Sequence, residues 1–243
     1  MQKICIVIPC YNESKRLPLK IFETYIGDNE INFCFVDDGS NDSTYQILLS
    51  LHEKFSDKVQ VIKNNPNLGK AESVRKGINS SLKWKEFDYL GFFDADLSTP
   101  LDEINHIMQY FGVNRKFKFA LGSRWNRLGS RIERNPIRHY LSRIFATLVS
   151  TVLNLPVYDS QCGAKIMYAE IADKIFKEPF ISKWLFDIEL LARVQIYFSP
   201  DILVEVPLNN WKDLGKTKIK FLDTLKFPTA LFRIKMKYKM AAK

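Results

Sequence analysis

The stretch VDDGSNDST, residues 36–44, ends an apolar run with two consecutive carboxylates. The segment FFDADLSTP, residues 92–100, repeats the arrangement, and VIPCYNE, residues 7–13, places a tyrosine and a glutamate at the same point. In open α/β sheets, ligands bind beyond the carboxyl ends of the strands. We therefore expect these three segments to meet at one edge of a sheet and to bind a ligand there.

Apolar runs that resemble strands alternate with amphipathic, helix-like segments along the first half of the chain. The runs cover residues 3–8, 32–36, 58–62, 89–93 and 117–121, and the helix-like segments cover 15–26, 42–55, 69–83 and 101–112. This alternation predicts an α/β fold, in which a Rossmann-like, mostly parallel central sheet is flanked by helices.

A longer helix is predicted over residues 135–156, where Asn135 suits the N-cap, Pro136 the first turn and Pro156 the end. Its apolar positions share one continuous face. They are Ile137, Tyr140, Leu141, Ile144, Phe145, Leu148, Val149, Val152 and Leu153. Two interpretations stay open: an ordinary core-packing helix, or a helix lying in a membrane interface with Arg138 and Arg143 at the headgroups.

The net charge of +9 on 243 residues is concentrated at the C-terminal end. Residues 216–243 contain nine Lys or Arg and one acid, so the remainder is nearly neutral. Within this segment Leu231, Ile234 and Tyr238 form a helical stripe. We expect a basic amphipathic element that meets an anionic membrane surface, and not nucleic acid, because no reading motif is present.

The chain offers no other sign of a membrane segment or of an oxidised framework. No run approaches the ~20 apolar residues that a spanning helix needs, and only two residues precede the first predicted strand. The four cysteines show no metal-ligand spacing, and we expect reduced thiols. These features predict a cytoplasmic protein that is peripherally attached to the inner (cytoplasmic) face of a membrane.

The four carboxylates at the predicted sheet edge repel one another unless a cation lies between them. Asp37 and Asp38 follow one strand, and Asp94 and Asp96 follow another. Alternation along an extended chain lets Asp94 and Asp96 project to the same side. Mg²⁺ is commonly held by one or two carboxylates together with substrate phosphate oxygens. The pattern predicts a Mg²⁺ or Mn²⁺ site at Asp94 and Asp96.

The ordered set VIPCYNE, VDDGSNDST, NLGKAESVRKGI and FFDADLSTP resembles the nucleotide-sugar half of the family 2 inverting glycosyltransferases, which have the GT-A fold. The later segments GSRWNR, DSQCGAKIM, WLFDIELLARV and EVPLNNWKDLGKTKIK are similar to motifs of the dolichyl-phosphate glucosyltransferases and the related mannosyltransferases. The resemblance covers nearly the whole chain. It implies a glycosyltransferase domain over residues 1–215, with a nucleotide-sugar half to about residue 125 and an acceptor half from about 126, followed by the segment 216–243.

The resemblance also implies roles for particular residues. Asp96 would act in catalysis. If the acceptor is a sugar hydroxyl, a carboxylate must take its proton, and Asp187 is the candidate base. Glu189 lies two positions on, and because such positions face apart on a helix, we expect only one of the two to enter the site. Arg127, Arg131 and Gln161 would meet an acceptor phosphate, on a path lined by further arginines, among them Arg134. The residues expected to bind the nucleotide sugar are Pro9, Tyr11, Glu13, Val36, Asp38, Lys70, Asp94, Ala95, Arg124, Lys212 and Lys218.

The implied reaction moves a hexose from a nucleoside-diphosphate sugar to a polyprenyl or dolichyl phosphate, by a single displacement with inversion. The sugar stays open between glucose and mannose, because ADL at 95–97 stands where glucosyl relatives often have ADG. Alternatives are a same-fold transferase that acts on a sugar hydroxyl, a haloacid-dehalogenase-type phosphatase, and a catalytically silent binding module. The phosphatase motif normally follows the first strand of its domain, whereas here it follows the fourth.

Overall fold

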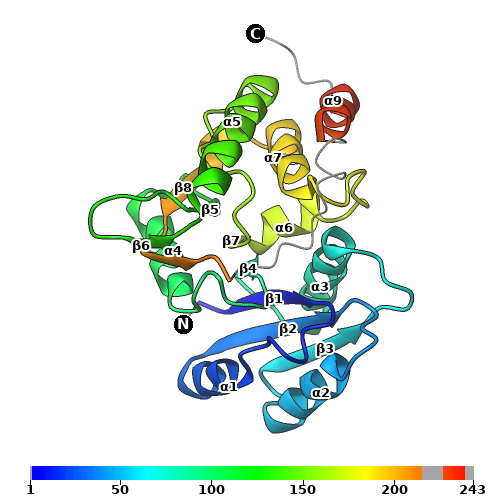
Figure 1. The fold of residues 1–243 in the computed structure, drawn as a ribbon. Helices are drawn as coiled ribbons and strands as arrows, with labels where there is room; N and C mark the ends of the chain where they lie inside the picture. Colours follow the sequence, from blue (N-terminus) through cyan, green and yellow to red (C-terminus); the bar gives the residue numbers. More distant parts are fainter. Residues whose placement is uncertain (1, 215–226, 239–243) are drawn as a thin grey trace.

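The computed structural model describes residues 2–214 and 227–238, except for the side chains of residues 137 and 138. Its central sheet has seven strands in the order β3-β2-β1-β4-β7-β5-β8 (Figure 1). Only β7 runs antiparallel to its two neighbours; the other pairs are parallel. The strands are β1 (Ile4–Cys10), β2 (Ile31–Asp37), β3 (Val59–Lys63), β4 (Tyr89–Phe92), β5 (Phe119–Ser123), β7 (Lys165–Tyr168) and β8 (Leu203–Pro207).

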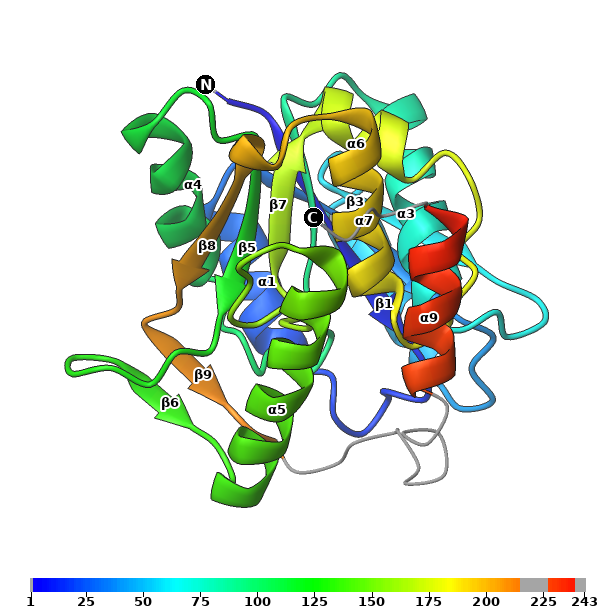
Figure 2. The same cartoon turned by 90° about the horizontal axis from the view of Figure 1, so that it is seen from above.

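Helices cover both faces of this sheet (Figures 1 and 2). Along β1, Ile4, Ile6 and Ile8 pack toward α1, α2 and α4, while Cys5 and Val7 pack toward α3, as the two-residue period of a strand requires. The second face also carries α5, α6, α7 and α9. The helices are α1 (Leu19–Asp28), α2 (Thr44–Lys54), α3 (Lys70–Trp84), α4 (Glu103–Val113), α5 (Pro136–Leu153), α6 (Ala169–Ile175), α7 (Phe186–Tyr197) and α9 (Phe227–Lys237).

The predicted α/β architecture is confirmed, and the five expected strands each overlap an observed strand. The expectation did not include β7, β8 or the small parallel pair β6 (Arg131–Glu133) and β9 (Asn210–Lys212). A short 3₁₀ turn, η1 (Pro200–Ile202), precedes β8. All four cysteines are free thiols in the interior. No helix within the described parts of the chain is both long and apolar enough to cross a membrane.

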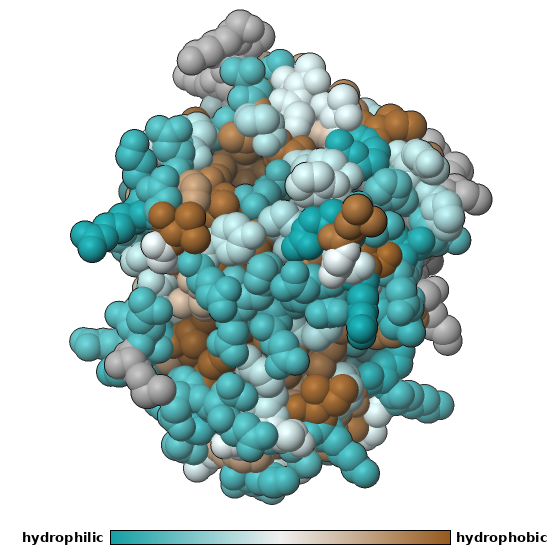
Figure 3. Space-filling view, turned by 90° about the vertical axis from the view of Figure 1, so that its left-hand side faces the viewer, coloured by the Kyte–Doolittle hydropathy of each residue, from teal (hydrophilic) through white to brown (hydrophobic). Residues whose placement is uncertain are grey.

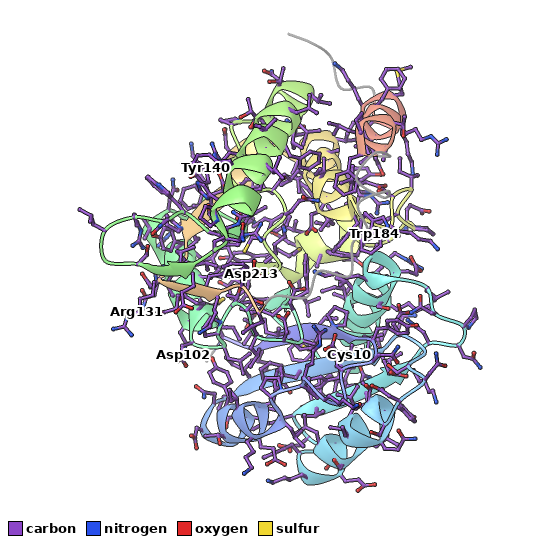
Figure 4. The ribbon with its side chains drawn as sticks, in the orientation of Figure 1. Cys10, Asp102, Arg131, Tyr140, Trp184 and Asp213 are labelled. Carbon is purple, nitrogen blue, oxygen red and sulfur yellow. The ribbon has the colours of Figure 1, made fainter. Side chains whose placement is uncertain are left out.

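Helix α5 begins where Pro136 predicted, but its apolar face is divided between the core and the surface. Val149 and Leu153 are buried, whereas Tyr140, Leu141 and Ile144 are more than 60% exposed. Figure 4 shows Tyr140 on the side of α5 that points away from α7. The first turns of α5 therefore present apolar side chains to the surface, and its last turns pack on the protein.

The apolar stripe of the C-terminal helix α9 packs against the rest of the protein. Leu231, Ile234 and Tyr238 are at most 8% exposed and join the hydrophobic core with residues of α5 and α7. The stripe is therefore covered by the protein and is not available to a membrane, and the expected contact of this helix with a membrane surface stays a prediction. Phe232 and Met236 are the exposed apolar side chains of α9, each 62% exposed. Lys218 and Lys239 lie outside the described residues.

Candidate active site

The carboxyl ends of β1, β2 and β4 meet at one edge because these strands are parallel neighbours. The amide of Asp38 donates to the carbonyl of Cys10 (2.8 Å), and the amide of Phe93 donates to the carbonyl of Val7 (3.1 Å). Pro9 lies beside Val36 in the β1–β2 register. The structure thus brings together the three segments that the sequence placed at one edge.

Asp38 fixes the loop that precedes α3. Its carboxylate accepts hydrogen bonds from Asn64 Nδ2 (2.9 Å) and from the amides of Leu68 (2.9 Å) and Gly69 (2.8 Å). Gly69 has φ +91°, a backbone conformation that residues with a side chain rarely adopt. Asp38, which is expected to bind the nucleotide sugar, therefore also sets the position of Lys70, the first residue of α3.

Lys70 connects the two acidic strand ends. Its Nζ donates to Asp94 Oδ1, and it lies 6.0 Å from the centroid of the Phe186 ring. Burial lowers the pKa of Lys70, but the nearby carboxylates of Asp94, Asp187 and Asp96 outweigh it, so the net shift is upward. The ammonium is thus held protonated beside Asp94, where it would stabilise the negative charge of a departing diphosphate.

The segment after Asp94 is a tight turn. The amide of Ser98 donates to Asp96 Oδ1 (3.0 Å), and Ala95 is buried. Leu97 has φ +53°, a region that favours glycine, which gives a physical reason for glycine at this position in relatives. The amide of Lys212 donates to the carbonyl of Ser98 (2.9 Å), so β9 runs alongside the turn.

Side-chain hydrogen bonds join the loops that follow β1 and β2. The amide of Glu13 donates to Thr44 Oγ1 (2.8 Å), and Ser14 Oγ donates to Asp42 Oδ2 (2.7 Å). The carboxylate of Glu13, 5% exposed, accepts two hydrogen bonds from Arg16. Tyr11 is half-buried in the same loop. The loop that carries the expected base- and ribose-contacting residues is therefore held firmly against its neighbour.

Arg124 forms a bidentate ion pair with Asp159. Its Nε and Nη2 donate to the two carboxylate oxygens at 2.6 Å each. Burial alone raises the pKa of Asp159, but the Arg124 guanidinium outweighs it and holds the pKa at about 2. Asp94 is one of the charges that influence Arg124, so the guanidinium contributes positive potential at the metal-side carboxylate. Its contact with phosphate stays a prediction.

The other basic residues expected at the site have varied surroundings. Arg127 Nη2 donates to Asn209 Oδ1 (3.1 Å), and Lys212 Nζ pairs with Glu133 (3.0 Å), both side chains being exposed. Arg131 is exposed and points outward from β6 (Figure 4). Arg143 stacks on the ring of Tyr158, 3.4 Å from its centroid. Arg124 and Arg134 both lie over the ring of Trp211, 5.3 Å and 6.0 Å from its centroid, and the expected path of arginines stays a prediction.

Two acidic residues of α7 face opposite ways. Asp187 Oδ1 accepts from Lys165 Nζ at 2.6 Å, and its charge also acts on Lys70. Glu189 binds Arg193 and Tyr238, away from Lys70. The expectation that only one of the two enters the site agrees with this geometry. Gln161, half-buried, precedes the turn that leads to Lys165.

Sequence reasoning did not single out three residues that the structure places at the site. A Cβ atom added to Gly163 would lie 2.0 Å from Asp94 Oδ2. Lys165 is completely buried beside Asp187. A Cβ atom on Gly69 would lie 3.9 Å from Cδ of Lys183. The segment DSQCGAKIM contains the first two, but a lysine inside a strand gives no sign of its partner.

The donor set fits a hard divalent cation. Asp94 and Asp96 supply carboxylates, and Asp94 already lies against the ammonium of Lys70, so this position favours positive charge. The described residues contain no group of three or more His, Cys, Asp or Glu side chains that could hold a metal ion. The two carboxylates would therefore need oxygens from a bound diphosphate or water, which is how Mg²⁺ is commonly held.

Comparisons with known proteins agree with this geometry. The family Glycosyl transferase family 2 matches residues 5–176. The dolichyl-phosphate beta-glucosyltransferase of Mus musculus is 31% identical over 98% of this chain and 76% of its own length, and that of Homo sapiens is 30% identical with the same coverage.

Solved structures show the same fold at low sequence identity. Glucosyl-3-phosphoglycerate synthase from Mycobacterium tuberculosis, in complex with Mn²⁺, uridine diphosphate and glucosyl-3-phosphoglycerate, has a TM-score of 0.68 at 17% identity, over 96% of this chain and 77% of that one. A mannosyltransferase from Pyrobaculum calidifontis, in complex with GDP-Man and Mn²⁺, has a TM-score of 0.61 at 14% identity, over 99% of this chain and 65% of that one. The fold is thus GT-A, and this chain belongs to glycosyltransferase family 2, as a hexosyltransferase.

Proposed function

We propose that the chain transfers a hexose from a nucleoside-diphosphate sugar to a polyprenyl or dolichyl phosphate, with inversion at the anomeric carbon. The observation that carries the proposal is the chain of contacts from Asp38 through Gly69 and Lys70 to Asp94. These contacts connect Asp38, expected to bind the nucleoside, with Asp94, expected to bind the diphosphate through a metal ion, along one edge of the sheet. The names of the full-length relatives support the lipid-phosphate acceptor.

Asp94 and Asp96 are the residues that would hold Mg²⁺ or Mn²⁺. The bound cation would supply Lewis-acid stabilisation of the leaving diphosphate. Lys70 and Arg124 add fixed positive charge at the same edge, which stabilises negative charge as it develops on the departing group. Lys212 and Lys218 belong to the proposed set that closes over the diphosphate.

The acceptor chemistry decides what Asp187 does. A lipid phosphate is already ionised near neutral pH and attacks without a strong base, whereas a sugar hydroxyl must give its proton to a carboxylate. Arg127, Arg131 and Gln161 are the proposed contacts of an acceptor phosphate. We favour glucose over mannose as the transferred sugar, because the most similar relatives named above are glucosyltransferases.

A membrane surface is the proposed place of the reaction, on its cytoplasmic face. Helices α5 and α9 are neighbours, with the rings of Phe145 and Phe227 5.4 Å apart. Each exposes apolar side chains, including Leu141 and Ile144 on α5 and Phe232 on α9. On the face seen in Figure 3, hydrophilic residues surround separate hydrophobic patches. Basic side chains of the C-terminal segment would add about 1 kcal/mol each near an anionic leaflet.

A donor screen tests the proposal. Purified protein is mixed with polyprenyl phosphate in anionic vesicles and with UDP-glucose, UDP-galactose or GDP-mannose, with and without Mn²⁺. We expect metal-dependent glycosyl transfer to the lipid, fastest from UDP-glucose. If no donor gives transfer to the lipid but a sugar hydroxyl is glycosylated, the hydroxyl-acceptor alternative replaces the proposal. An absence of metal dependence would remove the proposed role of Asp94 and Asp96.

A further inference from the structure

The turn from Cys162 to Lys165 lies between two carboxylates of the site. On one side, Gly163 packs directly on Asp94: an added Cβ atom would lie 2.0 Å from Oδ2 and 2.5 Å from Cγ. Real side chains essentially never approach this closely, so any residue other than glycine would displace the carboxylate or the turn. The backbone at residue 163 is therefore one wall of the position that Asp94 occupies.

On the other side of this turn, Lys165 reaches Asp187. Its Nζ donates to Asp187 Oδ1 and to the carbonyl of Cys162, each at 2.6 Å. One ammonium therefore closes the turn onto itself and binds the carboxylate of α7. The Phe92 ring, 5.4 Å from the ammonium, lies on β4 just before Asp94. Lys165 thus connects the end of β4, the turn and the N-terminal end of α7.

Burial separates the role of Lys165 from that of Lys70. The Lys165 side chain is 0% exposed, whereas that of Lys70 is 36% exposed and beside Asp94. A substrate can reach Lys70, but it cannot reach Lys165 without opening the core. A buried charge is strongly unfavourable once its partner is removed, so the Lys165–Asp187 pair holds its geometry while substrates exchange.

Only one oxygen of the Asp187 carboxylate has a hydrogen-bond donor among the described residues. Its side chain is 7% exposed, and Oδ1 is bonded to Lys165. Among the described residues, no hydrogen bond is made to Oδ2. The charge of Asp187 acts on Lys70, the ammonium that contacts Asp94. The ring of Phe186, the residue before Asp187, lies 6.0 Å from the same ammonium, so the N-terminal end of α7 lies beside the expected diphosphate side.

We propose that Lys165 is a positioning residue, which holds Asp187 in the orientation that contacts the transferred hexose. The inference rests on the proposed function, because it assigns a role within the same site. It treats Lys165, which no substrate touches, as acting only through Asp187. Two residues that act through one contact show non-additive effects when both are changed.

A double-mutant cycle tests the inference with Lys165→Met, Asp187→Asn and the combined variant. Two quantities are measured: the kcat of transfer to polyprenyl phosphate, and the ratio of the Kd values for UDP and UDP-glucose with Mn²⁺. The ratio reports sugar binding without any acceptor. Lys118→Met is the matched control, because Lys118 pairs with Glu170 at the surface, at 38% and 60% exposure.

Lys165→Met is expected to lower kcat about 100-fold, the size of effect that a misplacement of about 1 Å produces. The preference for UDP-glucose over UDP should fall about tenfold, as expected for a lost hydrogen bond to a charged group, while the Kd for UDP alone changes little. The combined variant should equal Asp187→Asn in both quantities. Lys118→Met should match the wild type.

Losses that multiply in the combined variant would overturn the inference, as would a folded Lys165→Met protein with wild-type sugar preference. If Lys165→Met does not fold, the comparison of the combined variant with Asp187→Asn still decides, because the combined variant leaves neither charge unpaired. A wild-type protein that binds UDP-glucose but transfers nothing to the lipid would refute the proposed function. In that case the Kd ratio alone tests the role of Lys165.

Discussion

Asp187 and Glu189 lie two positions apart on α7, both almost fully buried and both ion-paired, yet their surroundings differ. Asp187 has one hydrogen-bond donor, Lys165. Glu189 has four: Arg193 (2.9 Å), the hydroxyl of Tyr238 (2.7 Å) and the amides of Ile181 (2.9 Å) and Ser182 (3.4 Å). The second oxygen of Asp187 is left for the proposed contact with the hexose, whereas both oxygens of Glu189 accept hydrogen bonds from the protein.

The partner of Glu189 is equally satisfied. The five N–H groups of Arg193 donate to Tyr238, to Glu189 and to the carbonyls of Ile175, Glu178 and Pro179. This network joins α7, the segment after α6 and the C-terminal helix. Burial of a charged residue at this site therefore does not by itself indicate a function. What distinguishes Asp187 from Glu189 is that one of its carboxylate oxygens has no hydrogen-bond donor among the described residues.

The largest predicted effect comes from changing each carboxylate to its amide. Glu189→Gln should lower the free energy of unfolding by about 3–5 kcal/mol, because Arg193 would lose the charge that compensates its burial. Asp187→Asn also leaves a buried charge, that of Lys165, without its partner, so it too should lower stability. Of the two variants it alone should lower kcat of the folded protein, by about 100-fold, the size of effect expected when the bound hexose is misplaced. Urea unfolding and a transfer assay on the folded fraction measure the two quantities.

The comparison fails if the roles are exchanged. A Glu189→Gln protein that is stable but inactive, or an Asp187→Asn protein that is fully active per folded molecule, would contradict the assignment of one carboxylate to structure and the other to the site.

The ion pair of Asp159 with Arg124 should make the stability of the protein depend on pH. Its pKa of about 2 in the folded protein lies below the ordinary 3.8, so its pairing with Arg124 stabilises the protein above about pH 4. This contribution, about 2 kcal/mol, is lost as the pH falls from 4 toward 2. Urea unfolding between pH 2 and pH 6 should show a smaller acid loss in Asp159→Asn than in the wild type. Glu170→Gln, in an exposed pair, serves as the control, and equal acid loss in all three proteins would exclude the effect.

The smallest predicted effect concerns the C-terminal helix. The Tyr238 hydroxyl is buried between Glu189 and Arg193, and burial raises its pKa well above the ordinary value, helped by the charge of Glu189. Tyr238→Phe should lower the free energy of unfolding by about 1 kcal/mol, the usual value of a hydrogen bond. Phe232→Ala, on the exposed side of α9, should leave stability unchanged and weaken vesicle binding. The reverse pattern would show that α9 is not held through Tyr238.

The sheet edge and its acidic residues could be predicted from the sequence because the signal is local. Each apolar run ends in its own polar segment, so the sequence alone assigns Asp38 and Asp94 to one edge of a parallel sheet. The long helix was equally readable, since Asn135 and Pro136 mark its start within two residues.

The pairs that hold the site together could not be predicted, because their partners are far apart in sequence. Arg124 meets Asp159 across 35 residues, and Arg193 meets Tyr238 across 45. A helical period identifies the apolar stripe of α9 but not the surface that covers it, which here is formed by residues of α5 and α7. Lys165 begins a four-residue strand, and nothing in that strand's own sequence indicates that its lysine is completely buried.

The central claim is that Asp94 and Asp96 bind the nucleotide diphosphate through a divalent cation, and the binding of UDP measured by calorimetry tests it most directly. Mn²⁺ should tighten UDP binding to the wild-type protein by about tenfold or more, a difference of about 1.4 kcal/mol. In a folded Asp96→Ala protein, Mn²⁺ should have no such effect. Equal UDP affinity with and without Mn²⁺ in the wild type, or full retention of the metal effect in Asp96→Ala, would contradict the claim.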